Sequence, residues 1–275
     1  MSVMKKPVDA ARIALARTLK TLLSRVKFRG KGRILTTICP KHGELSIPLF
    51  GYDFACDLSE GIQRHIFLFN YDEHAEQFIR KHLKPGDTFL DIGANVGFYS
   101  LLAASIVGET GKVIAVEPNP KTYSKLKKTI ETNNIKNIVL LNIALGKERG
   151  SLDLYSHPES SNDTATMVAH DATETVKVEV FPLDELASTH GIETIDYLKI
   201  DVDGFEPDIF AGAKTLLAEG KIRMIQSEFC DYWLRENGSD PDSLHQLLTD
   251  AGFFDVDGAP SFVKDCNVDR FLIKR

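Results

Sequence analysis

Cysteine is scarce in this sequence of 275 residues. It holds only Cys39, Cys56, Cys230 and Cys266, and no two of them form a CxxC pair. Disulfide frameworks and zinc ribbons need closely grouped cysteines, so neither is expected. Long apolar runs are missing too, since no stretch approaches the roughly 18 to 20 apolar residues of a membrane-spanning helix. The N-terminus also lacks the apolar core and cleavage site of a secretory signal. These absences predict a cytoplasmic protein.

Positive charge is scarce outside the start of the chain. Residues 1–33 hold ten Lys and Arg against the single acid Asp9, a balance of +9, which leaves −15 for the remainder. A protein that grips nucleic acid by its phosphates draws on a broad positive surface. The acidic body therefore argues against a nucleic-acid substrate.

The basic segment has the pattern of an amphipathic helix over residues 7–27. Basic side chains are spread around an apolar face made of Val8, Leu15, Leu19, Leu22 and Val26. Such a helix lies on an anionic membrane, docks on a partner or packs on its own domain. Peripheral membrane contact through residues 7–27 is one prediction, and packing on the domain is its alternative. The sequence does not indicate an oligomeric state.

The spacing of apolar residues changes at about residue 70. Before it, the short runs RILTTI, ELSIPLF and HIFLFN predict a small antiparallel sheet, so residues 1–70 are expected to form a helix with a small β extension. After it, over 71–275, apolar strands alternate with helices. This alternation predicts an α/β domain with a parallel sheet covered on both faces. The expected strands are 88–92, 112–117, 137–141, 195–200, 222–228 and 271–274.

Two alternating runs interrupt this pattern between about residues 151 and 183. The runs SLDLYS and VKVEVFPL predict a hairpin at one end of the sheet. They flank a polar loop at about 157–175. Polar loops at strand ends commonly shape a pocket, so this loop and the N-terminal sheet are expected to determine which acceptor binds.

A glycine turn joins an apolar strand to an apolar helix in the stretch FLDIGANVGFYSLLAA. The turn reads Gly93-Ala-Asn-Val-Gly97 and lacks the third glycine of the G-x-G-x-x-G dinucleotide fingerprint. No Gly-Lys-Ser/Thr follows, which excludes a P-loop. Asp91, at the strand end, would repel a pyrophosphate but can attract an ammonium group. The turn therefore favours a ligand without phosphates.

The next strand ends in VIAVEPNP, which places Glu117 at its carboxyl end. A carboxylate there can accept hydrogen bonds from both hydroxyls of a ribose. Asp91 as a turn cap and Glu117 as a solvated acid are the structural alternatives, and their occurrence together around one turn weighs against both. A ligand with an amino-acid end, a ribose and no phosphate fits the description of S-adenosylmethionine.

The motifs FLDIGANVGFYS, VIAVEPNP, LLNIALG and IDYLKIDVDGFEPDIFAGAKTLL resemble those of the FkbM family of S-adenosylmethionine-dependent methyltransferases. The resemblance covers roughly residues 71–228. It implies the class I methyltransferase fold, a Rossmann-like sheet of seven strands with the last antiparallel, and methylation mostly of hydroxyl groups on sugars or natural products. The cofactor residues that it implies are Asp91, Gly93, Asn95, Gly97 and Glu117, with Asn142 and Ile143 where such enzymes meet the adenine. Many relatives of the broader fold carry an acid at that adenine position, and this chain does not.

The stretches LKIDVDGFE and IQSEF place further charged side chains where an open sheet binds its ligand. Asp201 is the predicted general base or acceptor-binding group, Glu228 is the second candidate, and Lys199 is a charge partner that tunes them. A rival interpretation has Asp201, Asp203 and Glu228 bind Mg²⁺. His65, His74 and His170 are further candidate bases. Asp203 and Glu206 are equally well explained as a turn residue and a helix-start acid.

These observations predict a cytoplasmic O-methyltransferase that acts on a hydroxyl of a saccharide, glycolipid or natural product. The acceptor is expected to be a small molecule or a glycan. One alternative is N-methylation of a peptide or small amine. The other is a noncatalytic cofactor-binding assembly subunit that recruits a partner through its basic helix.

Overall fold

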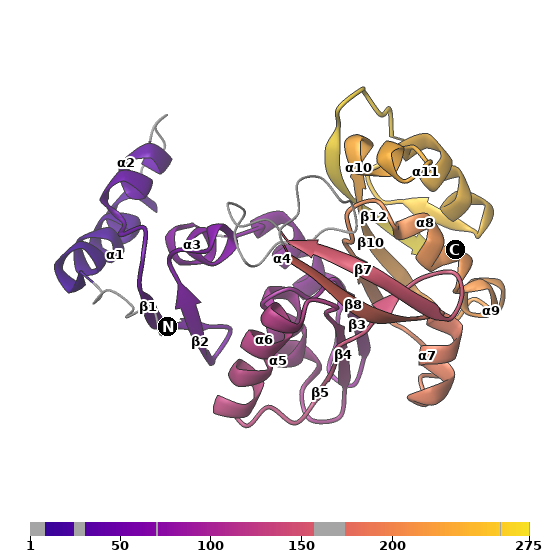
Figure 1. Ribbon diagram of the computed structural model, residues 1–275, viewed down its shortest axis with the longest axis horizontal. Coiled ribbons are helices and arrows are strands. Elements are labelled where there is room, and N and C mark those ends of the chain that lie inside the picture. Colours follow the sequence, from indigo (N-terminus) through magenta and orange to yellow (C-terminus); the bar gives the residue numbers. More distant parts are fainter. Residues whose placement is uncertain (1–8, 25–30, 70, 157–173, 259, 275) are drawn as a thin grey trace.

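A seven-stranded sheet lies at the centre of the molecule (Figure 1). The computed structural model describes residues 9–24, 31–69, 71–156, 174–258 and 260–274. The strands of this sheet are β3 (Thr88–Ile92), β4 (Lys112–Val116), β5 (Ile138–Leu141), β9 (Tyr197–Ile200), β10 (Met224–Cys230), β11 (Phe253–Asp255) and β12 (Asn267–Lys274). Their spatial order is β11-β12-β10-β9-β3-β4-β5, and β12 runs antiparallel to both of its neighbours while the five strands from β10 to β5 are parallel. The predicted class I methyltransferase fold is confirmed.

Alternate strand residues face two separate apolar cores, as the two-residue period of a strand requires. Phe89 and Val113 belong to one core, whereas Leu90 and Ile114 belong to the other. Helices cover both faces of the sheet (Figure 1). The first core packs against α4 (Glu73–His82), α5 (Phe98–Val107) and α6 (Pro120–Thr132), and the second against α7 (Leu183–Thr189), α8 (Glu206–Ala211), α9 (Lys214–Ala218) and α11 (Pro241–Asp250). The short helix α10 (Asp231–Glu236) directly follows β10.

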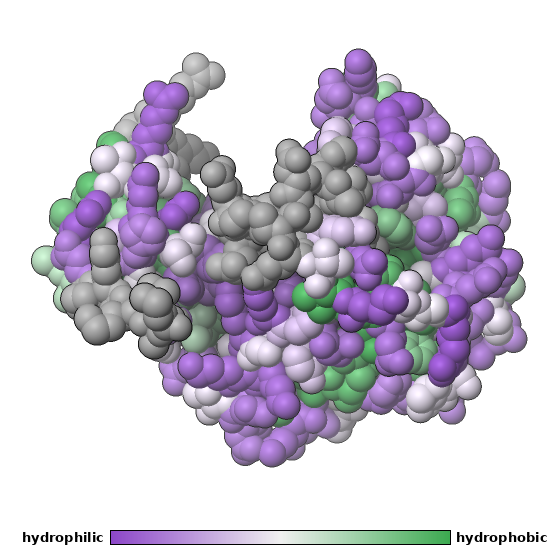
Figure 2. Space-filling model, in the orientation of Figure 1, coloured by the Kyte–Doolittle hydropathy of each residue, from purple (hydrophilic) through white to green (hydrophobic). Residues whose placement is uncertain are grey.

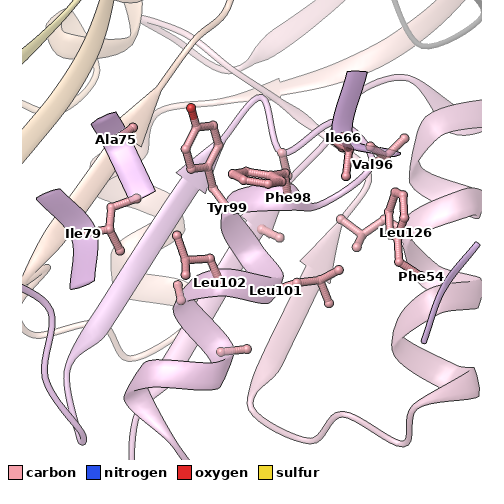
Figure 3. Close-up of a cluster of buried hydrophobic side chains, with 14 of the residues drawn as sticks. Phe54, Ile66, Ala75, Ile79, Val96, Phe98, Tyr99, Leu101, Leu102 and Leu126 are labelled. Atoms are coloured by element: carbon pink, nitrogen blue, oxygen red, sulfur yellow. The ribbon is translucent and has the colours of Figure 1, made fainter. Parts of the chain in front are cut away.

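The first turn of α5 is packed from several sides (Figure 3). Tyr99 stands beside Ala75 of α4, and the ring of Phe98 points toward Tyr99. These side chains are all buried, with exposed fractions of 8% or less. The start of α5, which follows the glycine turn, is thereby fixed by apolar contacts rather than by its own helix propensity.

The N-terminal part holds more helix than the sequence predicts. Its elements are α1 (Ala10–Ser24), α2 (Lys31–Ile38), β1 (Glu44–Leu49), β2 (Tyr52–Asp57) and α3 (Gly61–Leu68). Only β1 and β2 form the expected antiparallel pair. The strand predictions for RILTTI and HIFLFN were wrong, because these runs lie in α2 and α3, apart from the last two residues of HIFLFN. A short apolar run does not distinguish a strand from a buried helix by its period alone. Arg12 of α1 also supports the end of α2 by donating to the carbonyls of Thr37 and Ile38.

The apolar face predicted for the first helix was also wrong in part. Ile13 and Ala16 are the buried positions of α1, whereas Leu15 and Leu22 are 49% and 57% exposed. Val8 and Val26, predicted to share that face, lie outside the described residues. α1 thus packs on its own domain through Ile13 and Ala16, and the membrane contact predicted for residues 7–27 stays a prediction. In the described part of the chain, no helix has the length and apolar character needed to cross a bilayer.

The predicted hairpin is present and belongs to a third sheet. β7 (Gly150–Ser156) pairs antiparallel with β8 (Glu174–Phe181), which also pairs with the short β6 (Ala144–Leu145). The central part of the predicted polar loop, 157–173, lies outside the described residues, and His170 lies there too.

The N-terminal part is attached to the sheet domain through side-chain hydrogen bonds. The amide of Asn133, after α6, accepts from the backbone N–H of Asp53 at 2.7 Å and donates to its carbonyl at 2.9 Å. The space-filling view shows a notch at the top of the molecule between the N-terminal helices and the C-terminal helices α10 and α11 (Figure 2). The division of the chain at residue 70 stays a prediction.

Candidate functional site

A cavity lies at the carboxyl ends of β3, β4 and β9, where an open parallel sheet binds its ligand. Six residues singled out from the sequence line it, and other parts of its wall include Ile62 of α3 and Leu154 of β7. The six residues are Gly93, Asn95, Glu117, Lys199, Asp201 and Asp203. The remaining candidates from the sequence, Asp91, Gly97, Asn142, Ile143 and Glu228, are outside this lining.

Glu117 is the buried carboxyl group of the cavity, with an exposed fraction of 6%. Its Oε2 accepts the backbone N–H of Asn95 at 2.7 Å, and its Oε1 accepts that of Asn119 at 2.8 Å. A carboxylate oxygen has two lone pairs, so each oxygen can still accept from a ligand hydroxyl. Glu117 thus links the glycine turn to the end of β4 and can receive the two hydroxyls of a ribose. A buried carboxylate that can accept from two hydroxyls fits the ribose of the predicted S-adenosylmethionine.

The ionisation of Glu117 should control cofactor affinity. Burial raises the pKa of Glu117 to about 7, although the backbone N–H groups of Asn119 and Asn95 oppose the rise. Only the ionised carboxylate can accept from both ribose hydroxyls, so binding favours the deprotonated form. We expect the affinity for S-adenosylhomocysteine, measured by calorimetry, to fall by up to about tenfold per pH unit below pH 7 and to level off above it.

The control for this pH dependence is Glu117→Gln, which removes the ionisable group at nearly constant volume. We expect its affinity to be about tenfold weaker or more above pH 7 and to vary little between about pH 6 and pH 8. A variant that kept the full pH dependence would assign the titration to a different group.

Asn142 supports the segment after β4 by hydrogen bonds to its backbone. Its side-chain amide donates to the carbonyls of Glu117 and Pro118, at 2.8 and 2.9 Å. Asn142 therefore holds the chain that carries Glu117 and Pro118, and Pro118 lines the cavity. The adenine contacts expected for Asn142 and Ile143 stay a prediction.

The two glycines of the turn are required by packing within the protein. A Cβ on Gly93 would lie 2.0 Å from the carbonyl oxygen of Asp201, and one on Gly97 would lie 2.3 Å from Cδ1 of Leu126 in α6. Both residues have positive φ, +76° and +89°. The sequence predicted that small residues at these positions let the ligand approach the turn closely. In the structure, they let the backbone of Asp201 and the side chain of Leu126 approach it.

Gly93→Ala should be strongly destabilising because a backbone oxygen cannot move aside as a flexible side chain can. We expect a loss of about 2 kcal/mol or more in the free energy of unfolding. Gly191→Ala is the control, since Gly191 has φ +61° but no atom within 4 Å of its would-be Cβ. Urea denaturation of both variants separates the clash from the cost of positive φ, and equal losses would contradict the clash.

Lys199 is a buried cation at the floor of the cavity. Its Nζ donates to the carbonyl of Gly93 at 3.1 Å and lies 3.3 Å from Oδ2 of Asp201 and 3.8 Å from Oδ1 of Asp91. Burial lowers the pKa of Lys199, but Asp201 and Asp91 more than offset this, so the net shift is upward. A protonated Lys199 therefore joins the end of β3, the glycine turn and the end of β9.

Asp91 lies behind the cavity wall and is fully buried. Ser100 of α5 donates to its Oδ2 at 2.5 Å, while its Oδ1 has no hydrogen-bond partner. Burial raises the pKa of Asp91, and Lys199 opposes the rise. Asp91 thus supports Lys199 and the start of α5, and its predicted contact with the ammonium of the ligand stays a prediction.

Five carboxyl groups gather at the ends of β9, β10 and β12. Asp201 lines the cavity with a side chain that is 46% exposed. Burial raises the pKa of Asp203 to about 6, of Glu206 to about 8 and of Glu228 to about 9, and Asp201 adds to each rise. Asp269 is the fifth, and burial raises its pKa as well. Burial and the charge of Asp201 thus both favour the protonated forms of Glu206 and Glu228.

The arrangement of these acids does not support the predicted Mg²⁺ site. Within the described ranges, no group of three His, Cys, Asp or Glu side chains is placed to hold a metal ion. Oε1 of Glu206 instead accepts the backbone N–H of Val202 at 3.0 Å. The set Asp201, Asp203 and Glu228 is not brought together as metal ligands.

Two tyrosines in the cavity were missed by reasoning from the sequence. The hydroxyl of Tyr99 donates to Asp72, which begins α4, and its ring lies 5.1 Å from Nζ of Lys199. Tyr71 also lines the cavity, and burial, with Asp201 adding to the effect, raises its pKa to about 12. Tyr99 follows the glycine turn by two residues, but no pattern links it to Asp72.

The candidate histidines lie outside this site. The ring of His65 packs against Phe69 and Tyr71, and the ring of His74 packs against Phe271. Burial lowers the pKa of His65. Neither histidine lines the cavity.

Comparison with known proteins covers the same region of the chain. Residues 91–254 match the family described as the methyltransferase FkbM domain. Methyltransferase 1 of Beauveria bassiana is 28% identical over 164 residues, which cover 50% of this chain and 65% of the relative. The 2-O-methyltransferase NoeI of Sinorhizobium fredii is 26% identical over 172 residues, which cover 56% of this chain and 67% of the relative. The alignment thus spans about two thirds of the length of each relative.

Among solved structures, a methyltransferase FkbM from Methylobacillus flagellatus superposes with a TM-score of 0.45 at 12% sequence identity. The superposition covers 96% of this chain and 59% of that chain.

Proposed function

This chain belongs to the FkbM family of S-adenosylmethionine-dependent methyltransferases, and from this premise we propose that it methylates a hydroxyl group of a saccharide or glycosylated metabolite. The observation that carries the proposal is the meeting of Glu117, the glycine turn and Asp201 in one cavity. A buried carboxylate suited to ribose hydroxyls and a partly exposed acid thus line the same space. The relative named as a 2-O-methyltransferase supports oxygen as the acceptor atom.

The residues of the cavity divide into cofactor binding and acceptor activation. When bound, S-adenosylmethionine supplies a methyl group that its sulfonium has already activated. Glu117 would hold the ribose, and the turn Gly93–Val96 would hold the amino-acid end. The protein's further contribution is to hold the acceptor oxygen in line with that methyl group and to receive its proton.

Asp201 is the group best suited to receive this proton. It lines the cavity, and its side chain is accessible. Glu228 lies outside the lining, and burial together with the neighbouring carboxylates raises its pKa, which disfavours the ionised form that a base needs. Lys199 contacts both Asp201 and the carbonyl of Gly93, which makes it a positioning residue between the two halves of the site.

Transfer of isotope-labelled methyl into a fractionated extract of the source cells tests the proposal. We expect label in a glycan or glycolipid fraction that glycosidase releases and protease does not. Label that protease releases would overturn the saccharide assignment in favour of N-methylation of a peptide. Binding of cofactor with no labelled fraction would favour a noncatalytic assembly subunit. A chelator arm tests metal dependence directly.

A further inference from the structure

A second cavity lies between the N-terminal part and the sheet domain. Its lining comes from α1, β1, α3, α4 and the first residue of α5, and most of it is apolar or aromatic. Tyr71 and Phe98 line this cavity and the cofactor cavity alike. The two spaces are therefore neighbours that share a wall.

The shared wall is built from aromatic rings. The ring of Phe98 meets Tyr71 edge-on at 4.8 Å between centroids and meets Phe50 at 5.1 Å. Tyr71 in turn has Asp201 and Lys199 among the charges that act on it. A molecule that contacts Phe50 and Phe98 is thus separated from the predicted base, Asp201, by the ring of Tyr71.

The charge of the second cavity is positive. Arg17 donates to the carbonyl of Ser46 at 3.4 Å, and Lys20 donates to the carbonyls of Phe67 and Phe69 at 2.9 and 3.2 Å. Within the described residues, neither cation has a carboxylate partner. The acid in the lining, Glu76, is already paired with Arg80 at 2.8 Å. Two cations are therefore available at the edge of an apolar space.

We propose that this second cavity binds an apolar group bearing a phosphate or similar anion, and that this group is the non-reacting part of the methyl acceptor. The apolar group would lie along Phe50, Ile66 and Phe98, and the anion would meet Arg17 and Lys20, since cationic side chains bind phosphate by charge-assisted hydrogen bonds. The inference rests on the proposed function and narrows its acceptor to an anionic amphiphile whose sugar extends past Tyr71 toward Asp201.

Equilibrium binding of farnesyl phosphate to the full chain, below its micelle concentration and with saturating S-adenosylhomocysteine, tests the site. We expect farnesyl phosphate to bind more tightly than farnesol or inorganic phosphate alone. Arg17→Gln should weaken it by about tenfold, and Lys127→Gln, which removes the same charge from the exposed face of α6, should leave it unchanged. Equal affinities for farnesol and farnesyl phosphate, or an unchanged Arg17→Gln variant, would overturn the proposal.

Three further outcomes distinguish this proposal from membrane binding and from a failure of the proposed function. Binding to phosphatidylglycerol vesicles without binding to soluble farnesyl phosphate would assign Arg17 and Lys20 to a membrane surface and overturn the acceptor site. Label transfer by a protein that does not bind farnesyl phosphate would overturn this inference alone. Farnesyl phosphate binding in a protein that binds no S-adenosylhomocysteine would overturn the proposed function, and with it the acceptor role of the cavity.

Discussion

Asp201→Asn is expected to lower the rate of methyl transfer by about 10²- to 10⁴-fold, the range typical of a lost general base. Asparagine keeps the shape of the side chain but cannot accept a proton. Cofactor affinity should change little, because Glu117 and the backbone of the turn make the predicted cofactor contacts. The measurement is the initial rate of label transfer into the acceptor fraction, with the affinity for S-adenosylhomocysteine determined on the same samples.

Asp208→Asn is the charge-matched control for this variant. Asp208 is exposed on α8 and does not line the cavity, so its removal should leave the rate near that of the unsubstituted protein. An Asp201→Asn protein with full activity would exclude Asp201 as the base. A fall in cofactor affinity equal to the fall in rate would instead give Asp201 a role in cofactor binding.

Lys199→Met is expected to cost about 3 to 5 kcal/mol in the free energy of unfolding, the usual result of removing one partner from a buried ion pair. The substitution leaves Asp91 buried without its cation and leaves the carbonyl of Gly93 without this donor. Methionine can fill most of the volume, so the loss reports charge and hydrogen bonding more than packing. Urea denaturation provides the measurement.

A double-mutant cycle separates the ion pair from other effects of this substitution. Asp91→Asn combined with Lys199→Met removes both charges and should recover part of the stability that the single variant loses. Lys127→Met, at the exposed pair with Glu131, should cost less than about 1 kcal/mol. Strictly additive losses at positions 91 and 199 would show that the two side chains do not interact.

Six strands of the central sheet could be predicted because apolar runs mark them, whereas the three-residue strand β11, in which only Phe253 is buried, was missed. Phe89 and Leu90 face opposite cores, and a strand buried on both faces appears in the sequence as a continuous apolar run. The helices α2 and α3 could not be predicted in the same way. They are eight residues each, and Leu35 or Ile66 is buried by contacts with other elements, which a local pattern does not contain.

In the candidate site, too, residues within a local motif could be predicted, whereas contacts between distant segments could not. Glu117 and Gly93 could be found because each lies at the end of a strand, next to a turn with a known chemical use. Tyr99 and Asp72 are 27 positions apart and meet only because α4 packs against α5. The carbonyl of Asp201 beside Gly93 is likewise a contact between β9 and β3 that no motif records.

The contact between Gly93 and Asp201 involves the backbone of Asp201, whereas its side chain lies 3.3 Å from Nζ of Lys199. A substitution at position 201 therefore keeps the carbonyl that packs against the turn, but it removes the carboxylate beside Lys199, which in turn donates to Gly93. Insertions or deletions near residue 201 would shift the carbonyl and disturb the turn. Designers who wish to redirect the enzyme to new acceptors should accordingly keep Asp201 and the loop length after β9, and vary other lining residues such as Ile62 and Leu154.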